Sequence, residues 1–77
     1  MTKKETEILK KKFGENLQKI RESKDLSLLR LSYNCSIDES HISKIEQGKF
    51  NITLSTIVEL AKGLEVPPKK LLDFDTE

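Results

Sequence analysis

The sequence predicts an all-α fold, a bundle of five short helices. Two observations support this fold class: every apolar run has the three- and four-residue spacing of a helix, and short connections separate the runs. With 77 residues the chain is expected to form one domain. Aromatic residues make up only 5%, so Ile, Leu and Val must form most of the core. A domain of this size buries only about 60% of its unfolded surface, which favours support from a second subunit.

The first helix is indicated by an apolar stripe that ends near Lys24. The members of this stripe are Leu9, Phe13, Leu17 and Ile20. Gly14 interrupts the pattern and weakens the helix by about 1 kcal/mol relative to alanine. Residues 1–7 are polar and are expected to be frayed. Residues 1–12 are therefore interpreted as a lysine-rich extension that can continue the first helix.

The second and third helices are marked by residues that typically begin and end helices. Ser27 is a good N-cap for a helix from Leu28 to about Asn34. After a tight connection, Asp38 caps a third helix that runs to about Gln47. Gly48 follows, where a residue with left-handed backbone angles commonly ends a helix.

Thr53 is the expected N-cap of the fourth helix, and Pro68 suits the first turn of a fifth short helix. The stripe of the fourth helix is predicted to consist of Leu54, Ile57, Val58, Ala61 and Leu64.

Charge and cysteine content limit the possible functions. The 14 basic and 13 acidic residues leave a net charge of +1, which is not the strong positive charge typical of nucleic-acid-binding domains. Binding to DNA would therefore depend on where individual charges are placed. A single cysteine is typical of a reducing compartment. No apolar run has the length of a signal peptide or of a membrane span, so a cytoplasmic protein is expected.

The third helix can present a polar face outward. At about 100° per residue, Ile42 and Ile45 share the buried side. The outward side is then formed by Ser40, Ser43, Lys44 and Gln47, with Glu39 at its leading edge. The remaining acidic residues have local explanations, because Asp38 caps the helix and Glu46 borders the core, where it needs a partner.

Two helices joined by a short turn, with polar side chains on the second, are typical of a helix-turn-helix. The stretch "HISKIEQGK", followed by an asparagine and "TLSTIVELAKGLEV", resembles the Cro/repressor-type helix-turn-helix family, often called XRE. The resemblance implies a phage-repressor-like five-helix domain over residues 13–74, with residues 75–77 as a tail. The segment "NITLSTIVELAKGLEV" also resembles controller proteins of restriction–modification systems.

The resemblance also implies site residues. The third helix would read DNA, and the family positions that contact bases correspond to Glu39, Ser40, Ser43 and Lys44. The positions that contact phosphates correspond to His41, Gln47, Lys49 and Asn51. An ion pair between Arg21 and Glu46 is implied as well, and would give Glu46 its partner.

The sequence departs from the family pattern at two positions of the helix-turn-helix. Leu28 stands where glutamine commonly contacts phosphate, and Ser36 stands where glycine commonly adopts left-handed angles in the turn. The family's dimer contact would fall on Leu71, Leu72 and Phe74.

The main hypothesis is a sequence-specific transcriptional regulator that binds double-stranded DNA as a homodimer on a palindromic operator. The alternative is an adaptor or antitoxin-like module that keeps the fold without specific DNA binding. No catalytic set, cofactor or small-molecule site is indicated, and Cys35 with His41 provides too few ligands for a metal. The N-terminal lysines could contact DNA phosphates, contact an acidic partner or form a solvated face.

Overall fold

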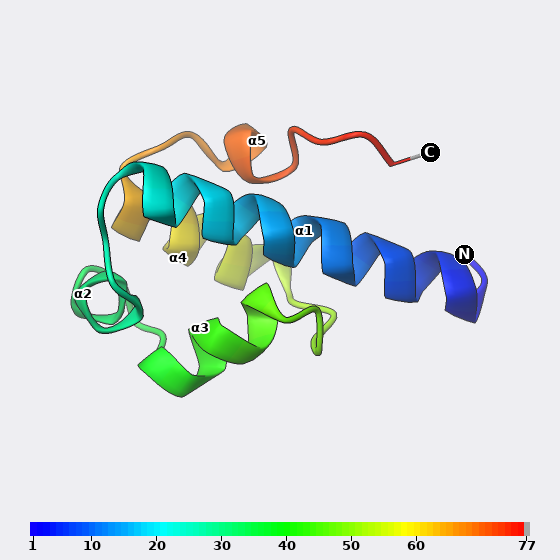
Figure 1. The fold of residues 1–77 in the computed structure, drawn as a ribbon, viewed down its shortest axis with the longest axis horizontal. Helices are drawn as coiled ribbons and strands as arrows, with labels where there is room; N and C mark the ends of the chain where they lie inside the picture. Colours follow the sequence, from blue (N-terminus) through cyan, green and yellow to red (C-terminus); the bar gives the residue numbers. More distant parts are fainter. Residues whose placement is uncertain (77) are drawn as a thin grey trace.

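The structure is a computed structural model that describes residues 1–76. It contains five helices and, within those residues, no strand: α1 (Lys3–Ser23), α2 (Leu28–Tyr33), α3 (Glu39–Glu46), α4 (Leu54–Leu64) and α5 (Pro68–Leu71). Figure 1 shows α1 running along the molecule, with α5 on one side and α3 on the other. The all-α, five-helix prediction is confirmed. None of the helices of residues 1–76 has both the length and the apolar character needed to cross a bilayer.

The start of α1 differs from the sequence prediction. Residues 1–7 were expected to be frayed, yet α1 begins at Lys3. Thr2 and Glu5 form a capping box, in which Glu5 N–H donates to Thr2 Oγ1 at 3.0 Å and Thr2 N–H donates to Glu5 Oε1 at 2.8 Å. These two bonds satisfy backbone donors that a helix end leaves unpaired. The N-terminal extension is therefore part of a single 21-residue helix.

The predicted N-caps are present, since Ser27, Asp38 and Thr53 each accept a backbone hydrogen bond from the first turn of α2, α3 and α4 respectively. Gly48 has φ +78°, the left-handed conformation expected after α3. Ser36 does not have left-handed angles, contrary to the expectation, so serine carries no backbone strain there.

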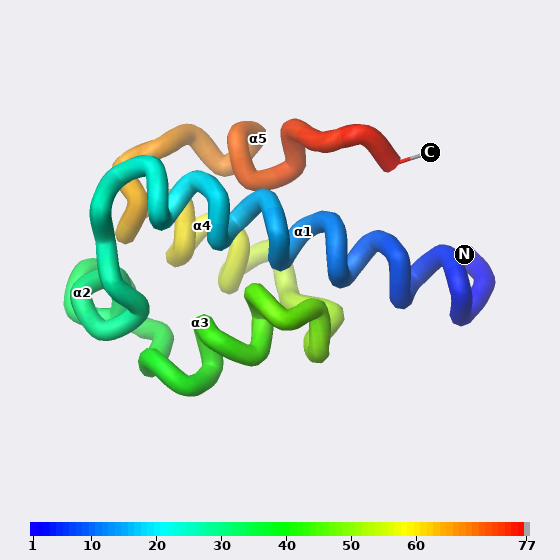
Figure 2. Tube along the Cα trace, viewed as in Figure 1, coloured from blue at the N-terminus to red at the C-terminus, as the bar shows by residue number. Residues whose placement is uncertain are grey.

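The core lies where all five helices meet. It is built from aliphatic side chains with one phenylalanine: Phe13, Leu17, Ile20, Leu31, Ile42, Ile45, Leu60, Ala61, Leu64 and Leu71. The trace in Figure 2 shows that these helices come from both ends of the sequence, so the core closes only when the whole chain is in place.

The buried side of α4 is rotated relative to the predicted stripe. Leu60 is fully buried although the prediction omitted it, while Leu54 is 79% exposed and Val58 is 40% exposed. Both patterns have helical spacing, since positions 54, 57, 58 and 61 are spaced like positions 57, 60, 61 and 64. The neighbouring helices decide between them, and Leu54 and Val58 remain as an apolar edge on the surface.

Helix α5 is held against α1 by polar and apolar contacts. The Asn16 side-chain amide donates to the carbonyl oxygens of Lys70 and Leu71, both at 3.0 Å. Leu71 is fully buried in the core. Leu71 is therefore not available to a second subunit, and its prediction as a dimer contact is wrong.

Candidate nucleic-acid interface

Helices α2 and α3 form a helix-turn-helix at one side of the molecule. They are joined by residues 34–38, and α3 lies with its C-terminal end close to α1 while its N-terminal end points away (Figure 1). The inward side of α3 is fixed by Ile42 and Ile45, which are 0% and 1% exposed. Because two buried side chains one turn apart set the rotation of the helix, the opposite side of α3 must face outward.

Gly14 determines how closely α3 approaches α1. A Cβ atom at this position would lie 2.4 Å from the Glu46 carbonyl oxygen and 2.5 Å from the Ile45 carbonyl oxygen. Only glycine leaves room for the two backbones to meet at this distance. The glycine that weakened the helix prediction is thus a packing requirement that fixes the C-terminal end of α3.

An ion pair beneath α3 joins the same two helices. Arg21 Nε lies 2.7 Å from Glu46 Oε2, Arg21 Nη2 lies 3.1 Å from Glu46 Oε1, and both residues are 8% exposed. Arg21 Nη1 also donates to the Leu26 carbonyl oxygen at 2.7 Å. The hydrogen bonds to Glu46 raise the pKa of Arg21 above its ordinary value. The structure therefore brings together the two residues that the family resemblance paired.

The four predicted base-contacting residues lie on the outward side of α3. Glu39, Ser40 and Lys44 are exposed, and Ser43 is partly exposed. Within residues 1–76 the side chains of Glu39 and Lys44 form no hydrogen bond or ion pair, so both are available to a ligand. Ser40 Oγ lies 3.2 Å from Asp38 Oδ2, which links it to the residue that caps the helix.

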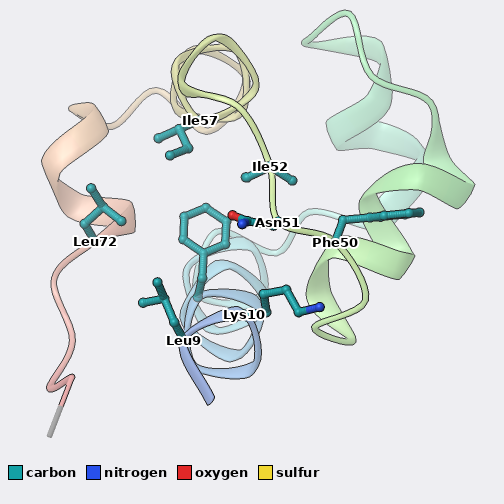
Figure 3. Close-up of a pocket in the computed structure, with 8 residues that line it drawn as sticks. Leu9, Lys10, Phe50, Asn51, Ile52, Ile57 and Leu72 are labelled. Atoms are coloured by element: carbon teal, nitrogen blue, oxygen red, sulfur yellow. The ribbon is translucent and has the colours of Figure 1, made fainter. Parts of the chain in front are cut away.

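The four predicted phosphate-contacting residues are all exposed, although Asn51 also lines the apolar hollow that Leu72 borders (Figure 3). Two of them also contact other side chains of the chain. Gln47 Nε2 donates to Ser43 Oγ at 3.0 Å, and the ring of His41 packs on the ring of Phe50 with centroids 5.0 Å apart. Lys49 and Asn51 lie in the loop after α3. The Phe50 contact ties this loop to α3, a feature that sequence reasoning did not predict.

The three predicted dimer residues have different environments. Leu71 is buried, Phe74 is half-buried against the core, and Leu72 is 51% exposed. Leu72 borders an apolar hollow with Leu9 and Ile57, and these side chains point toward one another in Figure 3. Sequence reasoning missed the exposed Leu54 and Val58, because it assigned both to the core.

Cys35 is half-buried, with Sγ 3.3 Å from the Leu31 carbonyl oxygen. Residues 1–76 contain no group of three His, Cys, Asp or Glu side chains placed to hold a metal ion. Charged, hydroxyl and amide groups on one helix, beside a loop that carries Lys49 and Asn51, are instead the groups that bind base edges and phosphates.

Comparison with known proteins defines the class. The model of the helix-turn-helix family HTH_3 matches residues 17–71, which is more than half of the chain. The chain belongs to this helix-turn-helix family, in agreement with the geometry of α2 and α3.

Its relatives within the family are more particular. The control protein C.BamHI of Bacillus amyloliquefaciens is 42% identical over 65 residues, covering 83% of this chain and 80% of the relative. The crystal structure of the restriction–modification controller protein C.AhdI from Aeromonas hydrophila matches with a TM-score of 0.77 at 34% identity, over 79% of this chain and 92% of that protein. The controller C.Esp1396I, solved as a tetramer with its natural 35-base-pair operator, matches at 30% identity with a TM-score of 0.73, over 84% of this chain and 96% of that protein.

Proposed function

We propose that this protein is a sequence-specific DNA-binding transcriptional regulator that inserts α3 into the major groove. The observation that carries the proposal is the outward face of α3, whose charged side chains are unpartnered within residues 1–76 while its inward face is locked to α1. The relative C.Esp1396I was crystallised on an operator, which supports the same use of the fold here. As a DNA-bound regulator, the protein would act in the cytoplasm.

The chemistry of the α3 face supports base recognition. Lys44 can donate to the acceptors of guanine, Glu39 can accept from the amino group of cytosine, and the serine hydroxyls can do either. The surrounding Lys49, Asn51, Gln47 and His41 would contact phosphates and so fix the orientation of the helix on the duplex. Leu28 offers no phosphate contact, so the loop after α3 would supply more of this orientation.

A homodimer completes this proposal. Leu72, Leu54 and Val58 place exposed apolar side chains on α4 and just after α5, and a second copy of the chain would bury them. Phe74 would contribute at the edge of this contact. Two copies of α3 would then read half-sites about 34 Å apart, one turn of DNA, on a palindromic operator.

The similarity to control proteins suggests which genes are regulated. We infer that the protein controls the expression of a restriction–modification system, because a 42% identical relative is a control protein and two similar structures are restriction–modification controllers. The alternative, an adaptor or antitoxin-like module, is favoured by the net charge of +1 and by Leu28 at a phosphate-contacting position.

Fluorescence anisotropy would separate the two functions. The protein would be titrated into a duplex taken from upstream of its own gene and into a scrambled duplex of equal length, each at two salt concentrations. A regulator should bind the upstream duplex more tightly, with an affinity that falls steeply with salt because phosphate contacts release counterions. Weak, salt-independent binding to both duplexes would instead support the adaptor.

Sedimentation equilibrium at tens of micromolar protein would test the dimer. We expect a mass near twice 8.9 kDa for the wild type. Leu72→Glu should shift the mass to that of the monomer, because it places a charge in an apolar contact. Leu29→Glu, which changes an exposed leucine of α2, is the matched control and should leave the dimer intact. A dimer that tolerates Leu72→Glu would show that the contact lies elsewhere.

A further inference from the structure

Positive charge is unevenly distributed along the chain. Residues 1–12 contain five lysines and two glutamates, a side-chain charge of +3. Residues 13–77 contain nine lysines and arginines and eleven aspartates and glutamates, a charge of −2. The segment that matches the helix-turn-helix family, residues 17–71, contains all nine of these basic residues and seven of the acidic ones, a charge of +2. The N-terminal extension, with +3 in twelve residues, is therefore the part of the chain where positive charge is densest.

The extension holds its lysines on a helix. The Thr2–Glu5 capping box starts α1 at Lys3, and α1 continues without interruption into the core. Figure 1 shows the N-terminal turns of α1 reaching past α3 and the loop that follows it. The lysine side chains therefore leave α1 from defined positions relative to α3.

Lys11 shows which side of α1 faces the proposed DNA surface. A Cβ atom on Gly48 would lie 2.9 Å from Lys11 Cγ and 3.0 Å from Lys11 Cα, so Lys11 packs directly on the end of α3. Lys4 precedes Lys11 by seven residues, two turns of helix, and Lys3 lies beside Lys4. These three residues are exposed and form what we call the lysine row: Lys3, Lys4 and Lys11. The row leads toward Lys49, an expected phosphate contact.

Nearby carboxylates offset the lysine row only in part. Glu7 lies within it, and Lys10 Nζ is 2.9 Å from Glu7 Oε1. The hydrogen bond and charge of Lys10, together with the charges of Lys3 and Lys11, lower the pKa of Glu7. Glu15, one turn beyond Lys11, and Glu22, eleven positions beyond it, are further acidic residues on this side of α1. The row together with Glu7, Lys10 and Glu15 keeps a net charge of +2.

We propose that the lysine row binds phosphates of double-stranded DNA outside the base pairs read by α3. Lys3 and Lys11 are eight positions apart, about 12 Å along a helix. That length spans several phosphates of one strand, which follow one another at about 3.4 Å along the DNA axis. This inference rests on the proposed DNA-binding function. It assigns to the extension an electrostatic contribution that adds to the charge of +2 in residues 17–71.

The test is a change in the salt dependence of DNA binding. The variant Lys3→Gln/Lys4→Gln/Lys11→Gln removes three charges, and Lys62→Gln/Lys69→Gln/Lys70→Gln, on α4 and α5, is the control with the same change in net charge. Glutamine has nearly the helix propensity of lysine, so α1 should persist, which circular dichroism would check. Both variants and the wild type would be titrated into the upstream duplex and the scrambled duplex over a series of salt concentrations.

Each lost phosphate contact lowers the slope of log affinity against log salt by about 0.9, so the row variant should lose about 2 to 3 in slope. The control variant should keep the wild-type slope. Equal slopes for the two variants would overturn the proposal, because the position of the lysines would then not matter. A row variant with the wild-type slope would also overturn the proposal and would indicate that the lysines bind an acidic protein partner.

The two duplexes separate this inference from the proposed function. Phosphate contacts are independent of sequence, so the slope tests the lysine row on either duplex. The ratio of affinities for the two duplexes tests sequence recognition by α3. If the protein binds both duplexes equally and shows the expected slopes, the lysine-row proposal stands and the proposed function is contradicted. Binding to neither duplex would contradict both proposals.

Discussion

The two faces of α3 use the same residue types in different ways. On the inward face, Glu46 is 8% exposed and both of its carboxylate oxygens are held by Arg21. On the outward face, Glu39 is exposed and forms no bond within residues 1–76. The same side chain thus stabilises the fold in one place and is available to a ligand in the other. The acidic residues of a reading helix do not by themselves argue against DNA binding.

Of the variants that test the difference between the two faces, the one that removes the inward carboxylate of Glu46 should lose the most stability. Glu46→Ala removes the buried carboxylate and leaves the Arg21 guanidinium with the Leu26 carbonyl and, at 3.9 Å, the exposed Glu22 carboxylate. It should lower the free energy of unfolding by about 3 kcal/mol. Urea unfolding followed by circular dichroism would measure this change. Glu39→Ala is the matched control on the outward face and should change stability by less than about 0.5 kcal/mol. Similar losses for the two variants would contradict the division between the faces.

Gly14→Ala should produce the second-largest loss of stability. Alanine gains about 1 kcal/mol of helix propensity over glycine, but its Cβ would meet the Glu46 and Ile45 carbonyl oxygens, which belong to the backbone and cannot rotate away. Overpacking of this kind should leave a net loss of about 2 kcal/mol. Thermal unfolding would show it as a lower Tm. A higher Tm would contradict the prediction, because it would mean that α1 and α3 can move apart without a loss of packing energy.

A substitution on the outward face should weaken DNA binding and leave the stability of the fold unchanged. Lys44→Ala removes a base donor from an exposed position, so the free energy of unfolding should stay constant. Affinity for the specific duplex should fall by about 1 to 2 kcal/mol, and discrimination at one base position should relax. Anisotropy titrations against duplexes changed at single base pairs would detect this. An equal loss on every duplex would indicate that Lys44 contacts phosphate and reads no base.

The sequence was sufficient for most of the fold because its local signals are strong. Ser27, Asp38, Thr53 and Gly48 each mark a helix boundary through chemistry that involves only neighbouring residues. The frayed start expected for α1 was wrong even though its signal was present, since Thr2 and Glu5 stand three residues apart, as in a capping box. The segment lacks an apolar stripe, so periodicity gives no sign of a helix there and the capping box is the only local signal.

The remaining errors concern contacts between distant segments. The apolar sets that contain Leu54 and Leu60 have the same helical spacing. Only the position of α4 against its neighbours buries Leu60 and exposes Leu54. Leu71 and Leu72 are adjacent, so nothing local distinguishes core from surface. For the candidate site, the direction of the outward face followed from Ile42 and Ile45. The contact of His41 with Phe50 did not follow, because it depends on how the loop folds back.

The length of α3 has a consequence for how the protein folds. Isolated helices shorter than about 12 to 15 residues are marginal in water, and α3 has eight. Its C-terminal end is supported by Gly14 and Arg21, which lie 32 and 25 positions away from Glu46 in the chain. The reading helix therefore becomes fully stable only when a long loop has closed and α1 has docked. Partly folded chains lack the recognition surface, so only complete molecules can compete for DNA.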